Sequence, residues 1–140
     1  MNALTKEILR EALLLNPVEK AELIEQLYQS FETSLDDEVA TLQHEFEHTF
    51  AELTDTWRKE TAIFSSATTI AMHPAYQRII GMGEKVIPLI LRELQKEPDH
   101  WFWALSAITG DNPIQPEDAG DIEKMRNAWL EYGKEHGYLA

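Results

Sequence analysis

The run at residues 86–91, Val86-Ile87-Pro88-Leu89-Ile90-Leu91, decides whether the fold contains a β-sheet. Its hydrophobicity would suit a buried strand, but Pro88 has no N–H to donate to a strand ladder. The apolar side chains instead recur at helical spacing through residue 94: Val86, Ile87, Ile90, Leu91 and Leu94. No stretch of the sequence alternates polar and apolar residues as a strand does. The sequence therefore predicts an all-α fold.

Short helices, divided by glycine, serine and proline, are expected on both sides of this run. Residues 86–95 and 101–109, with an acidic turn between them and Gly110 after them, resemble a HEAT-type helical hairpin. A solenoid needs about three such repeats, and only one is clear. We therefore expect residues 63–140 to form a compact helical block that contains a single hairpin of this type.

A long amphipathic helix is predicted before this block, over residues 36–60. Its apolar positions recur every three or four residues: Val39, Leu42, Phe46, Phe50, Leu53 and Trp57. Ser34, followed by Asp37, is typical of a helix N-cap, which predicts a helix start at this point. The stripe either packs on the rest of the chain or forms a helix-in-groove or dimer contact.

Two shorter amphipathic helices are predicted at the N-terminus, on either side of Asn16-Pro17. Asn16 suits an N-cap, Pro17 the first helical position and Glu19 the acid of a capping box. The apolar stripes are Leu4, Ile8, Ala12 and Leu15 in one helix, and Ala21, Ile24, Leu27, Tyr28 and Phe31 in the next. We expect a hairpin whose apolar sides face each other. The whole chain is then one domain, 1–140, made of a hairpin (1–33), a long acidic helix (34–62) and the helical block (63–140).

Composition limits the possible functions. The chain has 140 residues, no cysteine, and 25 acids against 12 Lys and Arg, for a net charge of −13. Such a charge repels nucleic acid, which is bound through clustered Lys and Arg. No run is long enough to span a membrane, and no secretory pattern opens the chain. We expect a cytoplasmic protein that binds neither nucleic acid nor membrane and needs no cofactor.

The motif His44-Glu45-Phe46-Glu47-His48 matches the H-E-x-x-H pattern of zinc peptidases, in which both histidines bind zinc and the glutamate is the general base. On a helix, however, His44 and His48 point roughly 175° away from the apolar stripe, at about 100° per residue. Such an enzyme also needs a third ligand and a water-excluding cleft. We interpret the motif as accidental and expect no metal site, with a small zinc-dependent hydrolase as the alternative.

Two stretches resemble known bacterial families. Residues 4–32, from Leu4-Thr5-Lys6-Glu7-Ile8-Leu9 to Phe31-Glu32, resemble the opening of the addiction module component family of antitoxin-like proteins. Residues 57–139 resemble a family of uncharacterised small proteins through Trp57-Arg58-Lys59-Glu60-Thr61, His73-Pro74-Ala75-Tyr76-Gln77 and Trp101-Phe102-Trp103-Ala104-Leu105. The first resemblance implies an antitoxin-like protein, and the second implies one member of a pair of neighbouring genes but no activity.

These observations predict a non-enzymatic, acidic protein-binding module, such as the antitoxin or immunity partner in a two-gene system. Its partner would have a basic surface and could be the product of a neighbouring gene. The expected partner-binding residues are four acids that steer association and one aromatic anchor: Glu38, Glu45, Glu52, Asp55 and Trp103. Trp103 lies nearly opposite Trp101 on its helix, so it either packs in a second layer or meets a partner. A structural homodimer is the remaining alternative.

Overall fold

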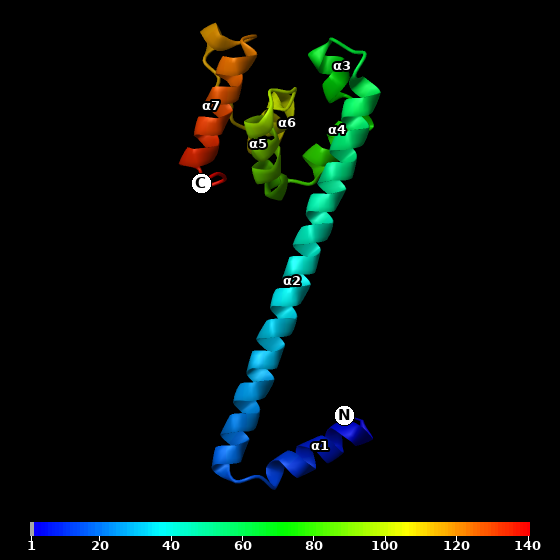
Figure 1. Ribbon diagram of the computed structural model, residues 1–140, viewed down its shortest axis with the longest axis vertical. Helices are drawn as coiled ribbons and strands as arrows, with labels where there is room; N and C mark the ends of the chain where they lie inside the picture. Colours follow the sequence, from blue (N-terminus) through cyan, green and yellow to red (C-terminus); the bar gives the residue numbers. More distant parts are fainter. Residues whose placement is uncertain (1) are drawn as a thin grey trace. The chain divides into compact units, whose positions relative to one another are not determined.

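A computed structural model describes residues 2–140, and over this range the protein is all-helical, as predicted (Figure 1). The helices are α1 (Ala3–Leu13), α2 (Pro17–Thr61), α3 (Ala67–Ala71), α4 (Pro74–Gly81), α5 (Ile87–Lys96), α6 (Phe102–Thr109) and α7 (Ile122–Glu135), with short 3-10 turns η1 (Glu84–Val86) and η2 (Pro116–Asp118). The chain divides into two compact units, Met1–Glu45 and Phe46–Ala140.

The first unit contains α1 and the N-terminal part of α2. Asn2 caps α1, since its side chain accepts a hydrogen bond of 2.8 Å from the Thr5 N–H. The predicted N-cap at the start of α2 is present: the Glu19 N–H donates to Asn16 Oδ1 at 2.9 Å, and the Glu19 carboxylate accepts from the Asn16 side-chain Nδ2 rather than from the backbone N–H of a capping box. Pro17 occupies the first helical position. This part of the local structure follows directly from the sequence.

The predicted helix start at Ser34 is wrong, because α2 runs without interruption from Pro17 to Thr61 (Figure 1). Neither glycine nor proline lies between these two residues to break the helix. Two threonine hydroxyls nearby are bonded within the helix, from Thr33 to the Gln29 carbonyl and from Thr41 to the Asp37 carbonyl, both at 3.0 Å. Polar side chains that could cap a new helix are thus accommodated within the existing one.

The core of the second unit is built around the last turns of α2. Trp57 lies 4.6 Å from Trp101 and 5.1 Å from Tyr76 between ring centroids, and its Nε1–H donates to the Ile70 carbonyl at 3.1 Å. The Tyr76 hydroxyl donates to the His100 carbonyl and accepts from the Ala104 N–H. These contacts hold α2, α4 and α6 together. Burial raises the pKa of Tyr76, so its hydroxyl stays protonated.

The predicted helical hairpin is present as α5 and α6, with α6 ending at Gly110 in the left-handed conformation (φ 75°). Arg58 on α2 reaches the turn between them, with Nε 3.0 Å from Asp99 Oδ2 and Nη2 3.2 Å from Glu93 Oε2. Burial alone would lower the pKa of Arg58, but the hydrogen bond to Asp99 and the charges of both carboxylates outweigh burial and raise it. The hairpin is therefore tied to the end of α2 by a partly buried ion pair.

Helix α7 packs on α5. Trp129 is fully buried, and Gly133 lies against Leu91 so closely that a Cβ there would come within 2.6 Å of Leu91 Cδ1. Arg126 donates to the carbonyls of Leu94 and Gln95, which caps the C-terminal end of α5. Beyond α7, the Tyr138 hydroxyl donates to Glu84 Oε1 at 2.7 Å. The C-terminus is thus fixed to the rest of the second unit.

Candidate functional site

One apolar stripe runs along α2 from residue 24 to residue 57, well beyond the stretch identified from the sequence. Its positions follow steps of four, three and four residues: Ile24, Tyr28, Phe31, Leu35, Val39, Leu42, Phe46, Phe50, Leu53 and Trp57. Such a pattern repeats every 11 residues, or about 3.67 residues per turn, close to the 3.6 of a straight α-helix. The stripe therefore stays on one side of the helix over its whole length.

The two parts of this stripe have opposite environments. In the second unit Phe50, Leu53 and Trp57 are buried in the core, and Phe46 is partly buried. In the first unit the six stripe side chains, together with Leu27 at the edge of the stripe, are between 43% and 66% exposed, and these seven are here called the 24–42 face: Ile24, Leu27, Tyr28, Phe31, Leu35, Val39 and Leu42. The stripe was predicted either to pack on the rest of the chain or to form a helix-in-groove or dimer contact. Packing on the rest of the chain is seen only after residue 45.

The N-terminal helices do not close into the predicted hairpin with facing apolar sides. No residue of α1 is buried, and its large apolar side chains are exposed: Leu4, Ile8, Leu9 and Leu13. Among the described residues of the first unit, partial burial is confined to the corner, at Ala12, Leu15, Lys20 and Leu23. An 11-residue helix gains little stability by itself and relies on tertiary packing of its apolar face. Within the described residues, α1 and the 24–42 face both lack such packing.

Negative charge borders the 24–42 face. Residues 21–57 contain no Lys or Arg, and their acids are Glu22, Glu25, Glu32, Asp36, Asp37, Glu38, Glu45, Glu47, Glu52 and Asp55. At about 100° per residue, Glu25, Glu32 and Asp36 lie along one edge of the stripe. Glu38 and Glu45 lie along the other edge. All five border residues are exposed. An apolar surface with acidic edges is complementary to an apolar surface with basic edges.

The residues predicted to bind a partner fall in different units. Glu38 and Glu45 belong to the first unit, whereas Glu52, Asp55 and Trp103 belong to the second. Glu52 Oε1 lies 3.1 Å from His48 Nε2, and Asp55 Oδ2 lies 2.8 Å from Lys59 Nζ, so both acids already have basic neighbours one turn away. Their role in steering a partner stays a prediction.

Trp103 points away from the core, as its position opposite Trp101 indicates. Trp101 and Leu105 are fully buried, while Trp103 is 46% exposed and lines a cavity. The second-layer packing considered for Trp103 is therefore only partial, and half of the indole remains accessible. The cavity was not expected from the sequence, since its walls come from segments separated along the chain.

The H-E-x-x-H motif lies on an exposed part of α2. His44 and His48 are both exposed, in line with their predicted direction away from the stripe. His48 is close to Glu52. In the part of the chain that the structure describes, no group of three or more His, Asp or Glu side chains is placed to hold a metal ion. The two imidazoles thus have no third protein ligand among these residues.

No protein-family model matches the chain, and the comparisons with curated proteins and with solved structures found no match. The resemblances of residues 4–32 and 57–139 accordingly stay predictions. Within residues 2–140, no helix has both the length and the apolar character needed to cross a membrane.

Proposed function

We propose that this chain is a non-enzymatic protein-binding module whose 24–42 face receives an amphipathic helix of a partner with basic residues beside its apolar side. One observation carries the proposal: the stripe that forms the core of the second unit continues, exposed, along the same helix in the first. Isolated exposed apolar residues are ordinary, but a contiguous face of seven is typical of an interaction surface.

The size of the surface supports a specific interface. Burying one large apolar side chain removes on the order of 100 Å² from water, at about 25 cal/mol per Å². Seven partly exposed side chains therefore present roughly 500 Å² of apolar surface, and α1 adds four more such side chains in the same unit. A stable interface buries about 800 Å² per partner. The exposed surface of the first unit is of this order.

Its shape favours a helix as the binding element. The face is a single stripe along one uninterrupted helix, and no residue on it is even partly buried by a neighbour in the first unit. A second helix can lie along such a stripe and insert its apolar side chains between those of α2. Steps of three and four residues in the partner would match the 11-residue pattern.

Charge favours a basic partner over a second copy of the chain. If two copies paired through this face, the border acids of one helix would lie beside those of the other, and no Lys or Arg between residues 21 and 57 would compensate them. Like charges beside an interface weaken association and slow it. A partner with Lys or Arg at the border positions gains from the same acids. We therefore favour a heterologous complex, with the homodimer as the alternative.

In cellular terms, we propose that the partner is the product of a neighbouring gene and that the chain acts in the cytoplasm as an antitoxin-like or immunity-type protein. The resemblance of residues 4–32 to antitoxin-like proteins supports this assignment. Co-expression with the neighbouring gene tests it: the two products should co-purify, and replacing Phe31 and Leu35 by Ser should abolish the complex. Failure to co-purify would refute the choice of partner.

A defined probe tests the binding mode itself. The probe is a synthetic helix of two 11-residue repeats, with Leu at the stripe positions and Lys at the borders. We expect the peptide to gain helical circular dichroism on binding, and expect the Phe31→Ser, Leu35→Ser double variant to prevent this gain. Ile63→Ser, which changes an 88% exposed residue in the other unit, is the matched control. A scrambled peptide of equal charge that bound equally well would contradict the proposal.

A further inference from the structure

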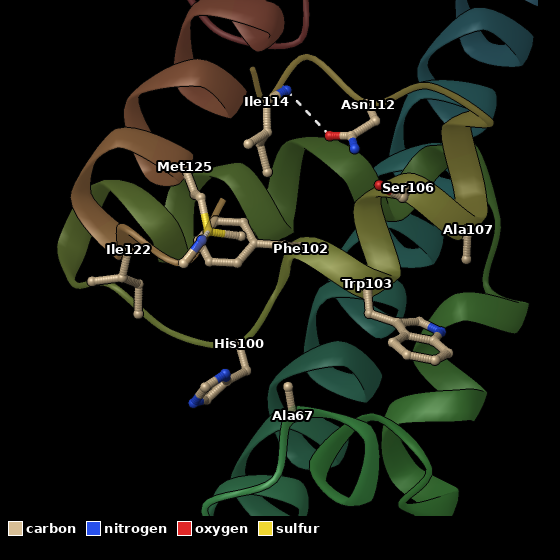
Figure 2. A pocket seen from close by; sticks show the side chains of 11 residues that line it. Ala67, His100, Phe102, Trp103, Ser106, Ala107, Asn112, Ile114, Ile122 and Met125 are labelled. Atoms are coloured by element: carbon tan, nitrogen blue, oxygen red, sulfur yellow. Dashed lines mark hydrogen bonds between the residues drawn. The ribbon is translucent and has the colours of Figure 1, made fainter. Parts of the chain in front are cut away.

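A cavity of about 670 Å³ opens in the second unit, beside α6 (Figure 2). Its walls come from α6, from His100 in the turn before α6, from the connection to α7, from the first turn of α7 and from Ala67 at the start of α3. The volume lies within the range of about 300–1,000 Å³ that is usual for small-molecule sites. All of these segments belong to one compact unit, so the cavity does not depend on how the two units are placed.

The sequence Trp101-Phe102-Trp103 creates the aromatic part of this cavity. Successive residues of a helix point about 100° apart, so burying Trp101 turns the next two rings out of the core. Figure 2 shows Phe102 with Met125 and Ile122 at one end of the cavity, and Trp103 at the other. Phe102 is partly buried, whereas the Trp103 indole is 46% exposed. A flat ligand could therefore contact apolar side chains at one end and an indole at the other.

The lining carries no charged side chain, although the chain has 25 acids and 12 Lys and Arg. Its polar groups are few and neutral or weakly basic: the Ser106 hydroxyl, the Asn112 amide and the His100 imidazole. Asn112 Oδ1 accepts the Ile114 N–H at 3.1 Å, which orients the side chain and leaves Nδ2 as a donor (Figure 2). An apolar cavity with a few oriented polar groups is typical of a ligand site.

We propose that this cavity binds a small uncharged molecule with two or more fused or linked rings and one hydrogen-bond acceptor. A cavity of about 150 Å³ holds a single benzene ring. The volume of about 670 Å³ is several times larger than one inserted aromatic side chain needs, so it has room for more than one ring. The ring system stacks on Trp103 and contacts Phe102. The acceptor receives a hydrogen bond from Asn112 Nδ2 or the Ser106 hydroxyl. An anionic ligand is disfavoured, because neither Lys nor Arg lines the cavity.

The neutral dye N-phenyl-1-naphthylamine is a suitable probe, because its fluorescence rises when it leaves water for an apolar site. We expect saturable binding to the full chain at one site. Trp103→Ala, which removes the stacking surface, and Ala107→Phe, which adds a bulky ring to the cavity wall, should each weaken binding at least about tenfold. The anionic analogue 1-anilinonaphthalene-8-sulfonate should bind more weakly than the neutral dye.

Two controls separate this site from the other exposed apolar surfaces. The Phe31→Ser, Leu35→Ser variant should bind the dye as the unmodified chain does, as should Ile63→Ala. Thermal unfolding of Trp103→Ala should be nearly unchanged, because the side chain is half exposed. Dye binding that is absent, or indifferent to both Trp103→Ala and Ala107→Phe, would overturn the proposal. The proposal would also be overturned if the chain did not bind the dye and Trp103→Ala lost the protein partner. The surface around Trp103 would then be a protein interface.

Discussion

Leu42 and Leu53 occupy equivalent positions on α2, 11 residues apart, yet Leu42 is 58% exposed and Leu53 is 9% exposed. The helix is continuous between them and the apolar pattern does not change. The two leucines differ in what packs on them. The helices of the second unit pack on Leu53, whereas nothing among the described residues buries Leu42. The proposed function follows from this contrast.

Alanine substitutions at these two positions should have very different effects on stability. Leu53→Ala leaves a cavity in the core and should lower the free energy of unfolding by about 2–4 kcal/mol. Leu42→Ala should change it by less than about 0.5 kcal/mol, as is usual for exposed sites. Urea denaturation of the two variants measures the difference. Equal losses would mean that the 24–42 face is already buried in the isolated chain.

Gly133 is expected to be intolerant of any side chain. Gly133→Ala would place Cβ 2.6 Å from Leu91 Cδ1 and 3.1 Å from Leu139 Cδ1, and Leu91 is fully buried. We expect a loss of about 1–3 kcal/mol from overpacking. Gly81→Ala is the matched control, because no heavy atom lies within 4 Å of its Cβ position. Thermal unfolding should separate the variants, and a neutral Gly133→Ala would contradict the packing of α7 on α5.

Stability should fall at alkaline pH through Tyr138. The hydrogen bond to Glu84 raises the pKa of Tyr138 to about 12, above the usual value of about 10 for an unfolded chain. The folded state therefore retains this proton where the unfolded state has lost it. The contribution is complete below about pH 10 and disappears as the pH rises to about 12. Unfolding temperatures across this range should fall less steeply for Tyr138→Phe; identical slopes would exclude the hydrogen bond as the cause.

The histidine pair should be dispensable. Because His44 and His48 are exposed and have no third ligand among the described residues, replacing both by Ala should leave folding and peptide binding unchanged. Elemental analysis of protein purified without a histidine tag should give far less than one zinc per chain. One zinc per chain, lost in the double variant, would instead support the hydrolase alternative.

The fold could largely be predicted from the sequence where local signals act alone. The helix around Pro88, the N-cap at Asn16 and the stop at Gly110 each depend on residues close in sequence. The start expected at Ser34 failed for a physical reason, since Ser-x-x-Asp can lie within a helix whose polar side chains are exposed or bond its own carbonyls.

The candidate sites were less predictable. Periodicity shows that one side of α2 is apolar, but it does not show what covers that side, so Leu42 and Leu53 look alike in the sequence. The steps that extend the stripe back to Ile24 were the available signal for the 24–42 face. The cavity beside α6 had no such signal, because it combines residues as far apart as Ala67 and Met125.

The most direct test of the central claim is a charge exchange across the proposed interface, measured by the dissociation constant of the peptide. The unmodified chain should bind the Lys-bordered helix at least about tenfold more tightly than the same helix bordered by Glu, and Glu38→Lys with Glu45→Lys should remove most of this preference, because only Glu25, Glu32 and Asp36 then remain as border acids. The difference should shrink as salt is raised to about 1 M, where the Debye length falls to about 3 Å. Equal affinity for both peptides, unchanged by the reversals, would contradict the account and leave the 24–42 face without a basic partner.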